Sequence, residues 1–289
     1  MTKISLINGV FSNKVSVFER GLAYGDGLFE TMTWQNFNSD EYPNQVEFWT
    51  RHLQRIFIGC RTLSIKPPNA KILNNYKNKI LKKANILGLN KGILKIIISR
   101  GIGGRGYKYD KDIKPTIIFL AFPFSKYPEK FYKKGVSVRF CDSRLSSNEN
   151  LVGLKHLNRL DSVLARAEWS NQKIFEGLFC DDKENIIEGT MTNIFLVRKN
   201  TLYTPEIKES GINGIMRQVI IENYKNFFDQ IKITKISRGN IREFQQIFLT
   251  NSVLKIMPVA KIEENKFSVL GKIKEIIDYY ELQENLEFN

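Results

Sequence analysis

Apolar and polar residues recur along the chain with two different periods, which predicts a protein built from both helices and strands. In residues 49–63 the apolar side chains recur every three or four positions, as on one face of a helix. A second helix is expected over residues 69–87, after Pro67-Pro68 and before Gly88. Strands are expected in short apolar runs between turn residues, here residues 3–7, 27–34, 93–99 and 116–121.

The pattern breaks at residues 123–134, which contain two prolines and several charges and precede Gly135. We interpret this segment as a linker between a smaller N-terminal domain, residues 1–122, and a larger C-terminal domain, residues 135–289.

The larger domain continues the mixture of helices and strands. A helix is expected after residue 155, and one of its faces is apolar: Leu160, Val163, Leu164 and Ala167. Further helices are expected at residues 215–228 and 270–282, and strands at 136–142, 177–181, 193–198, 201–203 and 246–250. The order of elements predicts an α/β (α+β) fold of two domains, each a mixed sheet with helices, and a ligand site in the cleft between them.

The composition is that of an ordinary globular protein and disfavours several other classes. Of 289 residues, 42% are apolar and 26% charged, and no run of about 18 apolar residues occurs that could span a membrane. The N-terminal residues lack the long apolar stretch of a secretory signal. Three dispersed cysteines and two histidines predict neither a disulfide framework nor a metal site. We therefore expect a cytoplasmic protein without a metal ion or a membrane partner.

The formal net charge of +14 permits two interpretations. One is a surface for an anionic partner such as nucleic acid. The other is a surface rich in solvated lysines, which is favoured because the lysines are dispersed from Lys3 to Lys274 without a block of five like charges. Aromatic residues also do not alternate with the cations, as a platform for stacked bases would require. We therefore expect no nucleic-acid partner.

Residues 101–106, GIGGRG, match the glycine pattern of dinucleotide-binding loops and follow an expected strand. Such a loop needs a helix that begins within the motif, because the pyrophosphate binds at that helix N-terminus. The following residues 107–115 have no apolar helical period and end at Pro115. We therefore interpret the motif as a loop between two strands.

Lys155 is the centre of the candidate chemistry. On its own it would be a solvated surface lysine, one of 44 cationic residues, but it lies in the segment LVGLKHLNRLDSVLARAEW at 151–169. Four other segments are ERGLAYGDGLFET at 19–31, IIEGTMTNIF at 186–195, SGINGIMR at 210–217 and TNSVLKIMPV at 250–259. In this order, and over nearly the whole chain, the five segments resemble the fold-type IV class of pyridoxal-5'-phosphate (PLP) enzymes. Within that class, the Lys155 segment resembles the cofactor-lysine segment of 4-amino-4-deoxychorismate lyases.

The resemblance implies a catalytic role for Lys155 and Thr31 and a cofactor-binding role for Lys155 and Glu188. Lys155 is expected to bind the PLP aldehyde covalently and later to move a proton, which requires an amine that deprotonates easily. Glu188 is expected to face the pyridine nitrogen of PLP, whereas from the residues alone a site role and an exposed turn position are about equally favoured. Thr31 is expected near the cofactor lysine with a part in proton handling, although its residue type also fits an ordinary strand position.

The resemblance also implies which residues bind the cofactor phosphate. They are the amides of Ile215 and Met216, at the N-terminus of an expected helix, and the hydroxyl of Ser252. Arg55 matches the phosphate arginine of the class, and the alternative for Arg55 is a salt bridge on its helix.

Substrate is expected to contact Arg105 and Tyr107, although both also fit an ordinary loop position. D-amino-acid aminotransferases of the class carry an Arg and a His there for the substrate carboxylate, so Tyr107 disfavours that activity. Whether Arg100 joins Arg105 stays open. Thr31 disfavours the branched-chain aminotransferases, which carry Gly at that position. Glu30, which aminotransferases share, keeps an aminotransferase activity open.

The family resemblance as a whole implies a PLP-dependent carbon–oxygen lyase. The implied reaction eliminates pyruvate from 4-amino-4-deoxychorismate and gives 4-aminobenzoate for folate biosynthesis. The alternative is a branched-chain or D-amino-acid aminotransferase of the same fold. Members of this fold are homodimers, so a homodimer is expected here as well.

Overall fold

The computed structural model of the chain describes residues 3–36 and 44–283. The described residues divide into two compact units, one of residues 3–36, 44–125 and 154–158, and the other of residues 126–153 and 159–283. The first unit therefore includes a short segment, Leu154–Asn158, that is distant in sequence from the rest of that unit. This segment contains Lys155.

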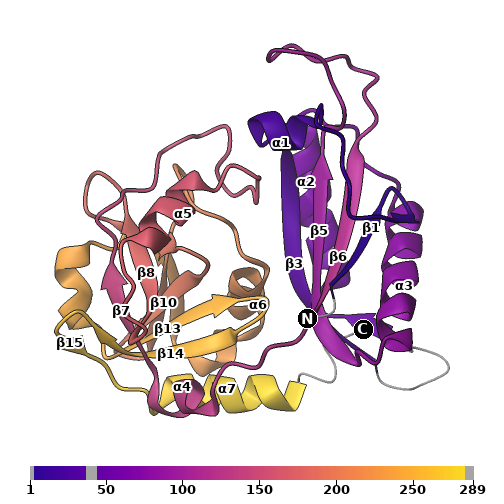
Figure 1. Ribbon diagram of the computed structural model, residues 1–289. Helices are drawn as coiled ribbons and strands as arrows, with labels where there is room; N and C mark the ends of the chain where they lie inside the picture. Colours follow the sequence, from indigo (N-terminus) through magenta and orange to yellow (C-terminus); the bar gives the residue numbers. More distant parts are fainter. Residues whose placement is uncertain (1–2, 37–43, 284–289) are drawn as a thin grey trace. The chain divides into compact units, whose positions relative to one another are not determined.

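The first unit is built on a six-stranded sheet in the order β2-β1-β6-β5-β3-β4 (Figure 1). The strands are β1 (Ile4–Ile7), β2 (Val10–Phe11), β3 (Gly27–Asn36), β4 (Asn44–Val46), β5 (Lys91–Ser99) and β6 (Thr116–Pro123). Every pair of neighbouring strands in it is antiparallel. The expectation of a mixed sheet is therefore wrong for this unit, because the apolar period of a strand carries no information about the direction of its neighbour.

Two helices, α2 (Trp49–Thr62) and α3 (Ala70–Ile86), pack on one face of this sheet, and the short helix α1 (Arg20–Tyr24) precedes β3 (Figure 1). Strand β5 alternates accordingly: Leu94, Ile96 and Ile98 are buried, whereas the residues between them are only partly buried. Burial of one face against helices stabilises the sheet, and the opposite face is left for other contacts.

The second unit is built on a nine-stranded sheet in the order β12-β11-β10-β13-β14-β7-β8-β9, and β15 pairs with β14. The strands are β7 (Val136–Phe140), β8 (Ile174–Cys180), β9 (Ile186–Gly189), β10 (Asn193–Arg198), β11 (Thr201–Pro205), β12 (Gln230–Thr234), β13 (Gln246–Asn251), β14 (Lys255–Ile262) and β15 (Asn265–Lys266). Three of its pairings, β11–β12, β14–β7 and β7–β8, are parallel. The mixed sheet expected for this part of the chain is confirmed.

The helices of the second unit are α4 (Glu129–Lys134), α5 (Leu160–Ala167), α6 (Ile215–Asn223) and α7 (Lys272–Gln283). Helix α4 occupies part of the segment interpreted as a linker. Helix α6 ends at Asn223 rather than at residue 228, and a 3-10 helix, Lys225–Phe227, follows. Among the described residues no helix is long and apolar enough to cross a membrane.

The apolar face of α5 does not lie in the core of its unit. Leu160, Val163 and Leu164 are 74%, 61% and 63% exposed, and only Ala165 on the other side of this helix is buried. Ala165 packs with Cys141, Trp169 and Phe179. The periodic pattern therefore predicted the helix, but it did not determine which face of that helix is buried.

Candidate active site

Lys155 lies on an extended segment that pairs with β3 in the first unit. The Phe29 amide donates to the Lys155 carbonyl at 2.9 Å, and the Leu157 amide donates to the Gly27 carbonyl at 2.9 Å. The segment also forms an antiparallel bridge between His156 and Leu28. These contacts fix the backbone from the Lys155 carbonyl to Leu157, so the Lys155 side chain starts from a rigid position.

The Lys155 ammonium lies over the ring of Phe29, with 4.5 Å between Nζ and the ring centroid. Thr31 is two residues further along β3 and therefore on the same face of the sheet as Phe29. Both Lys155 and Thr31 are partly buried. The structure thus brings both predicted catalytic residues, Lys155 and Thr31, to one face of the first unit, the face opposite α2 and α3.

Lys95, which was not predicted as a site residue from the sequence, belongs to the same cluster. It pairs with Thr31 across β3 and β5, and its Nζ lies 4.9 Å from the centroid of the Phe29 ring. Burial lowers the pKa of Lys95. The signal in the sequence was a lone lysine within the apolar strand at residues 93–99.

The opposite face of β3 carries a buried ionic cluster of Glu30, His52 and Arg55. Glu30 accepts from Arg55 Nε and Nη2, each at 2.6 Å, and lies 2.6 Å from His52 Nδ1. Burial alone would raise the pKa of Glu30, but Arg55 and His52 outweigh it and lower this pKa to about 2. Burial lowers the pKa of His52, so its ring is neutral near pH 7. Arg55, the predicted phosphate arginine, is therefore oriented by Glu30.

Replacement of Glu30 by glutamine is expected to reduce the free energy of unfolding at pH 7 by on the order of 3 kcal/mol, because Arg55 would lose its buried counter-charge. The folded pKa of Glu30, about 2, is below its ordinary value of 4.5. Its ionised form therefore stabilises the fold above pH 4.5, and this contribution is lost as the pH falls from 4.5 toward 2.

Urea denaturation of both proteins at several pH values measures this effect. The difference between wild type and Glu30→Gln should shrink below pH 4.5, whereas the exposed control Glu264→Gln should match wild type throughout. A difference that stays constant down to pH 2 would contradict the stabilising role of ionised Glu30.

Glu188 lies in the second unit at the end of β9 and is buried. Its Oε2 accepts from the Ile212 amide at 2.8 Å and from Asn193 Nδ2 at 3.3 Å. Asn193 Nδ2 also donates to the Ile212 carbonyl at 2.9 Å. An exposed turn position is therefore wrong for Glu188, whose carboxylate is fixed by donors from two other segments.

Glu176, on the neighbouring strand β8, organises the turn that follows Glu188. Its buried carboxylate accepts from the amides of Thr190 and Met191 and from the hydroxyls of Thr190 and Thr192. Burial raises the pKa of Glu176. The strand pattern alone did not predict Glu176, because its donors come from a turn that this pattern does not place beside it.

The N-terminus of α6 begins immediately beyond Ile212. Its cap is Gly214, and no side chain caps the helix, while Ile215 and Met216 are the first helical residues. A β-carbon on Gly214 would lie 2.0 Å from the Asn193 Oδ1 atom, so only glycine fits here. A helix N-terminus whose backbone N–H groups lack a side-chain cap favours the binding of anions.

Two further residues complete this part of the second unit. Arg217 donates to Asn213, Thr204 and the Pro205 carbonyl, and burial lowers its pKa to about 10. Ser252, the remaining predicted phosphate residue, follows β13, the strand on which α6 packs. Glu188 thus binds the segment that leads into α6, through the Ile212 amide and Asn193 Nδ2.

Arg105 and Tyr107 lie on the loop between β5 and β6 in the first unit, and their side chains are exposed. The glycine motif of this loop is followed by no helix, as the sequence analysis predicted. Arg100 does not extend toward Arg105: its guanidinium bonds Asp26 at 2.7 and 2.9 Å and the carbonyls of two residues that follow α2.

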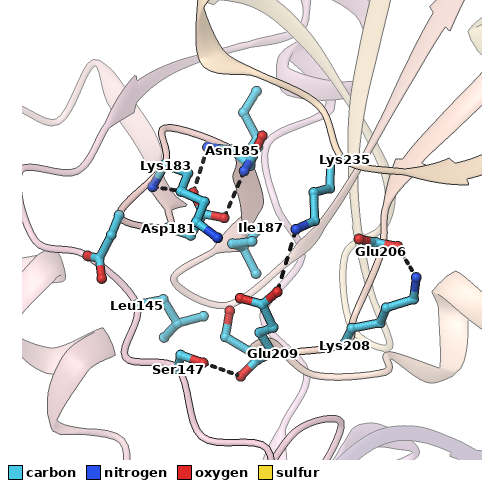
Figure 2. Close-up of a pocket in the computed structure, with 13 residues that line it drawn as sticks. Leu145, Ser147, Asp181, Lys183, Asn185, Ile187, Glu206, Lys208, Glu209 and Lys235 are labelled. Carbon is cyan, nitrogen blue, oxygen red and sulfur yellow. Dashed lines mark hydrogen bonds and ion pairs between the residues drawn. The ribbon is translucent and has the colours of Figure 1, made fainter.

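A cavity of about 240 Å³ lies elsewhere in the second unit and contains none of the predicted site residues (Figure 2). Four of the charged side chains that line it are already paired: Lys235 with Glu209, and Lys208 with Glu206. Among the described residues no group of His, Cys, Asp and Glu could hold a metal ion. The candidate residues are therefore described within each unit by itself, Lys155 with Thr31 in the first unit and Glu188 in the second, and not at this cavity.

Comparison with known proteins identifies the class to which this fold belongs. The structure is similar to 4-amino-4-deoxychorismate lyase from Pseudomonas aeruginosa, with a TM-score of 0.87 and 35% identity over 98% of this chain and 100% of that one. The fold is therefore that of fold-type IV PLP enzymes. The chain belongs to the amino-transferase class IV family, whose profile matches residues 27–262.

Two sequence relatives are named for different activities. An aminodeoxychorismate lyase of Vibrio harveyi is 28% identical over 270 residues, 92% of this chain and 95% of that protein. A putative branched-chain-amino-acid aminotransferase of Methanocaldococcus jannaschii is 29% identical over 262 residues, 89% and 87% of the two chains. Other solved structures of the fold hold PLP or pyridoxamine 5'-phosphate.

Proposed function

We propose that the protein is a PLP-dependent 4-amino-4-deoxychorismate lyase, which converts its substrate to 4-aminobenzoate and pyruvate for folate biosynthesis. The observation that carries the proposal is the cluster of Lys155 with Thr31 on one face of β3. Similarity to lyases from Pseudomonas aeruginosa and Vibrio harveyi supports it.

The residues present fit the cofactor. Lys155 offers a partly buried amine on a rigid backbone, and Glu188 offers a buried carboxylate with two donors on one of its oxygens. The uncapped amides of Ile215 and Met216 fit the phosphate, with Ser252 as a further donor. Arg55, whose Nε and Nη2 bind Glu30 on the α2 face of β3, is proposed for the phosphate from the family resemblance alone. When bound, PLP supplies an electron sink for negative charge at the carbon that bears the substrate amine.

Lys155 moves the proton in the proposed reaction. Its Nζ removes the hydrogen from the ring carbon that bears the amine, and the bond between the neighbouring carbon and the enolpyruvyl oxygen then breaks. The released enolpyruvate gains one proton, with Lys155 or Thr31 assisting, and becomes pyruvate. The ring becomes aromatic, and since all substrate atoms divide between the two products, neither water nor an oxidant is consumed.

Carboxylates of the substrate require cations. Arg105 is the proposed partner of one carboxylate, with Tyr107 beside it, and Lys95 next to Thr31 is well placed for another.

The Lys95→Met variant keeps the length of the side chain and removes its charge. We expect KM for aminodeoxychorismate to rise about tenfold with kcat within about threefold of wild type. An unchanged KM in steady-state pyruvate assays would show that Lys95 does not bind substrate.

The proposed function is tested by incubation of the purified, PLP-loaded protein with aminodeoxychorismate and measurement of pyruvate and 4-aminobenzoate. Equal amounts of the two products are expected. A protein that forms neither, yet transaminates leucine or D-alanine with 2-oxoglutarate, would refute the lyase proposal.

The second candidate function is an aminotransferase of the same fold. Glu30 and the similarity to the Methanocaldococcus jannaschii protein favour it. Thr31, Tyr107 and the segment GLKHLNRL at residues 153–160 favour the lyase instead. The two functions are separated by the same assay, because an aminotransferase consumes an amino acid and a 2-oxo acid together.

We also propose that the protein is a homodimer. Val17, Phe18 and Leu22, which lie at or near α1 in the first unit, are 77%, 68% and 68% exposed. Large apolar side chains that are exposed together in one short segment commonly mark an interface. Light scattering coupled to gel filtration should give twice the chain mass of 33.6 kDa, and a monomer at micromolar concentration would contradict the proposal.

A further inference from the structure

The loop at residues 100–115 is held in place by Arg20, the first residue of α1, which is 3% exposed. The Arg20 guanidinium donates from Nη1 to the Gly106 carbonyl at 2.9 Å and from Nη2 to the Tyr107 carbonyl at 3.2 Å. Its Nε donates to Asp26 Oδ2 at 3.0 Å. One planar cation therefore fixes two consecutive peptide units of the loop.

Tyr24, at the end of α1, holds the same stretch of the loop from a second direction. Its hydroxyl accepts from the Gly106 amide at 2.9 Å, and its ring centroid lies 4.7 Å from Arg20 Cζ. The rings of Tyr24 and Tyr107 are in tilted contact, with 5.6 Å between centroids. Both the amide and the carbonyl of Gly106 are thus bound by residues of α1.

Asp26 connects this arrangement to the rest of the first unit. It accepts from Arg20 and from both Nε and Nη2 of Arg100, and Arg100 also donates to the Leu63 and Ser64 carbonyls beyond α2. We call Arg20, Tyr24, Asp26 and Arg100 the loop clamp. Because the loop clamp contacts residues next to β3 and α2, the loop is anchored to the first unit at points other than its two ends.

Arg105 immediately precedes the two residues that the loop clamp holds. Its side chain is exposed, and among the described residues it forms no ion pair. Four of the six residues 101–106 are glycines, so without external contacts this stretch would have many backbone conformations to lose on binding. Fixing the loop beforehand removes that entropy cost from substrate binding.

We propose that Arg20, acting together with Tyr24, is a positioning residue that presets the loop so that Arg105 can bind a carboxylate of the substrate. The proposal rests on the proposed role of Arg105 in substrate binding. It predicts that damage to the loop clamp weakens substrate binding and leaves the chemistry at Lys155 unchanged.

Two variants test the proposal in the PLP-loaded protein. Arg20→Lys keeps the charge beside Asp26 but loses the planar fork that reaches two carbonyls, and Tyr24→Phe removes only the acceptor for Gly106. We expect KM for aminodeoxychorismate to rise about tenfold in Arg20→Lys and about threefold in Tyr24→Phe, with kcat and cofactor absorbance within twofold of wild type. The control Tyr76→Phe, on α3, should match wild type.

A double variant separates positioning from general destabilisation. If Tyr24 acts through Arg105, then Tyr24→Phe should add nothing to the KM of Arg105→Gln, because the group being positioned is already absent. Independent, multiplicative increases in KM would overturn the proposal, as would an unchanged KM in both loop-clamp variants.

Limited trypsin digestion provides a readout that needs no turnover. Arg105, Lys108 and Lys111 are exposed in the loop, and cleavage there should be about tenfold faster in Arg20→Lys than in wild type, since a released loop fits a protease more readily. Equal cleavage rates would overturn the proposal.

If wild type makes no pyruvate but transaminates an amino acid, the proposed function fails. The KM values of the loop-clamp variants are then compared with wild type for that amino acid.

Discussion

Replacement of Lys155 by alanine is expected to abolish both the visible absorbance of the bound cofactor and the formation of pyruvate. The expected loss in kcat is at least about 10⁴-fold, because the variant lacks the amine that binds the cofactor and moves the proton. The absorbance spectrum of the protein with added PLP, before and after borohydride, measures the covalent link, and a pyruvate assay measures turnover.

A matched control for this variant is Lys77→Ala. Lys77 is also a partly buried lysine of the first unit, with Nζ 5.1 Å from the Trp49 ring and a pKa lowered by burial. It should keep wild-type absorbance and activity. Borohydride-sensitive absorbance that survives in Lys155→Ala but disappears in the double variant with Lys95→Ala would mean that Lys95 carries the cofactor instead.

Glu188→Gln should reduce kcat by on the order of 10³-fold while the cofactor remains bound. A neutral amide cannot keep the pyridine nitrogen protonated, so the ring would lose most of its capacity to accept charge. In the variant, the glutamine side chain also replaces the carboxylate whose Oε2 now accepts from the Ile212 backbone N–H and from Asn193 Nδ2. Steady-state kinetics and the cofactor absorbance of the purified variant measure the two parts of this prediction.

Glu206→Gln serves as the control for Glu188→Gln, since Glu206 lies in the same unit and pairs with Lys208 at the surface. The control should retain wild-type kcat. If Glu188→Gln also retained wild-type kcat, Glu188 would not be the carboxylate that supports the cofactor ring.

Local patterns in the sequence were sufficient for most of the elements. The apolar period predicted α2, α3 and β5 within two residues of their observed ends, since burial of one face imposes the period directly. The glycine motif at residues 101–106 was correctly assigned to a loop, because no helical period follows it. The family resemblance, confirmed by the match over residues 27–262, depended on five short segments and not on periodicity.

The apolar period did not predict packing correctly where an element packs against another element that is distant in the chain. Leu160, Val163 and Leu164 form the apolar face of α5, yet that face is exposed, since a period identifies a face without identifying its neighbour. The antiparallel sheet of the first unit was missed for a similar reason, because strand direction depends on connections that cross several elements.

The sequence by itself determined the candidate chemistry: a lysine, a carboxylate and a helix N-terminus, each in a recognisable segment. Only the tertiary structure decided which groups support them. Lys95 joins Lys155 and Thr31 because β3 and β5 are adjacent in register, and Arg20 holds the Arg105 loop across more than 80 residues of chain. Hydrogen bonds and ion pairs form between atoms that are close in space, and a linear pattern does not encode that proximity.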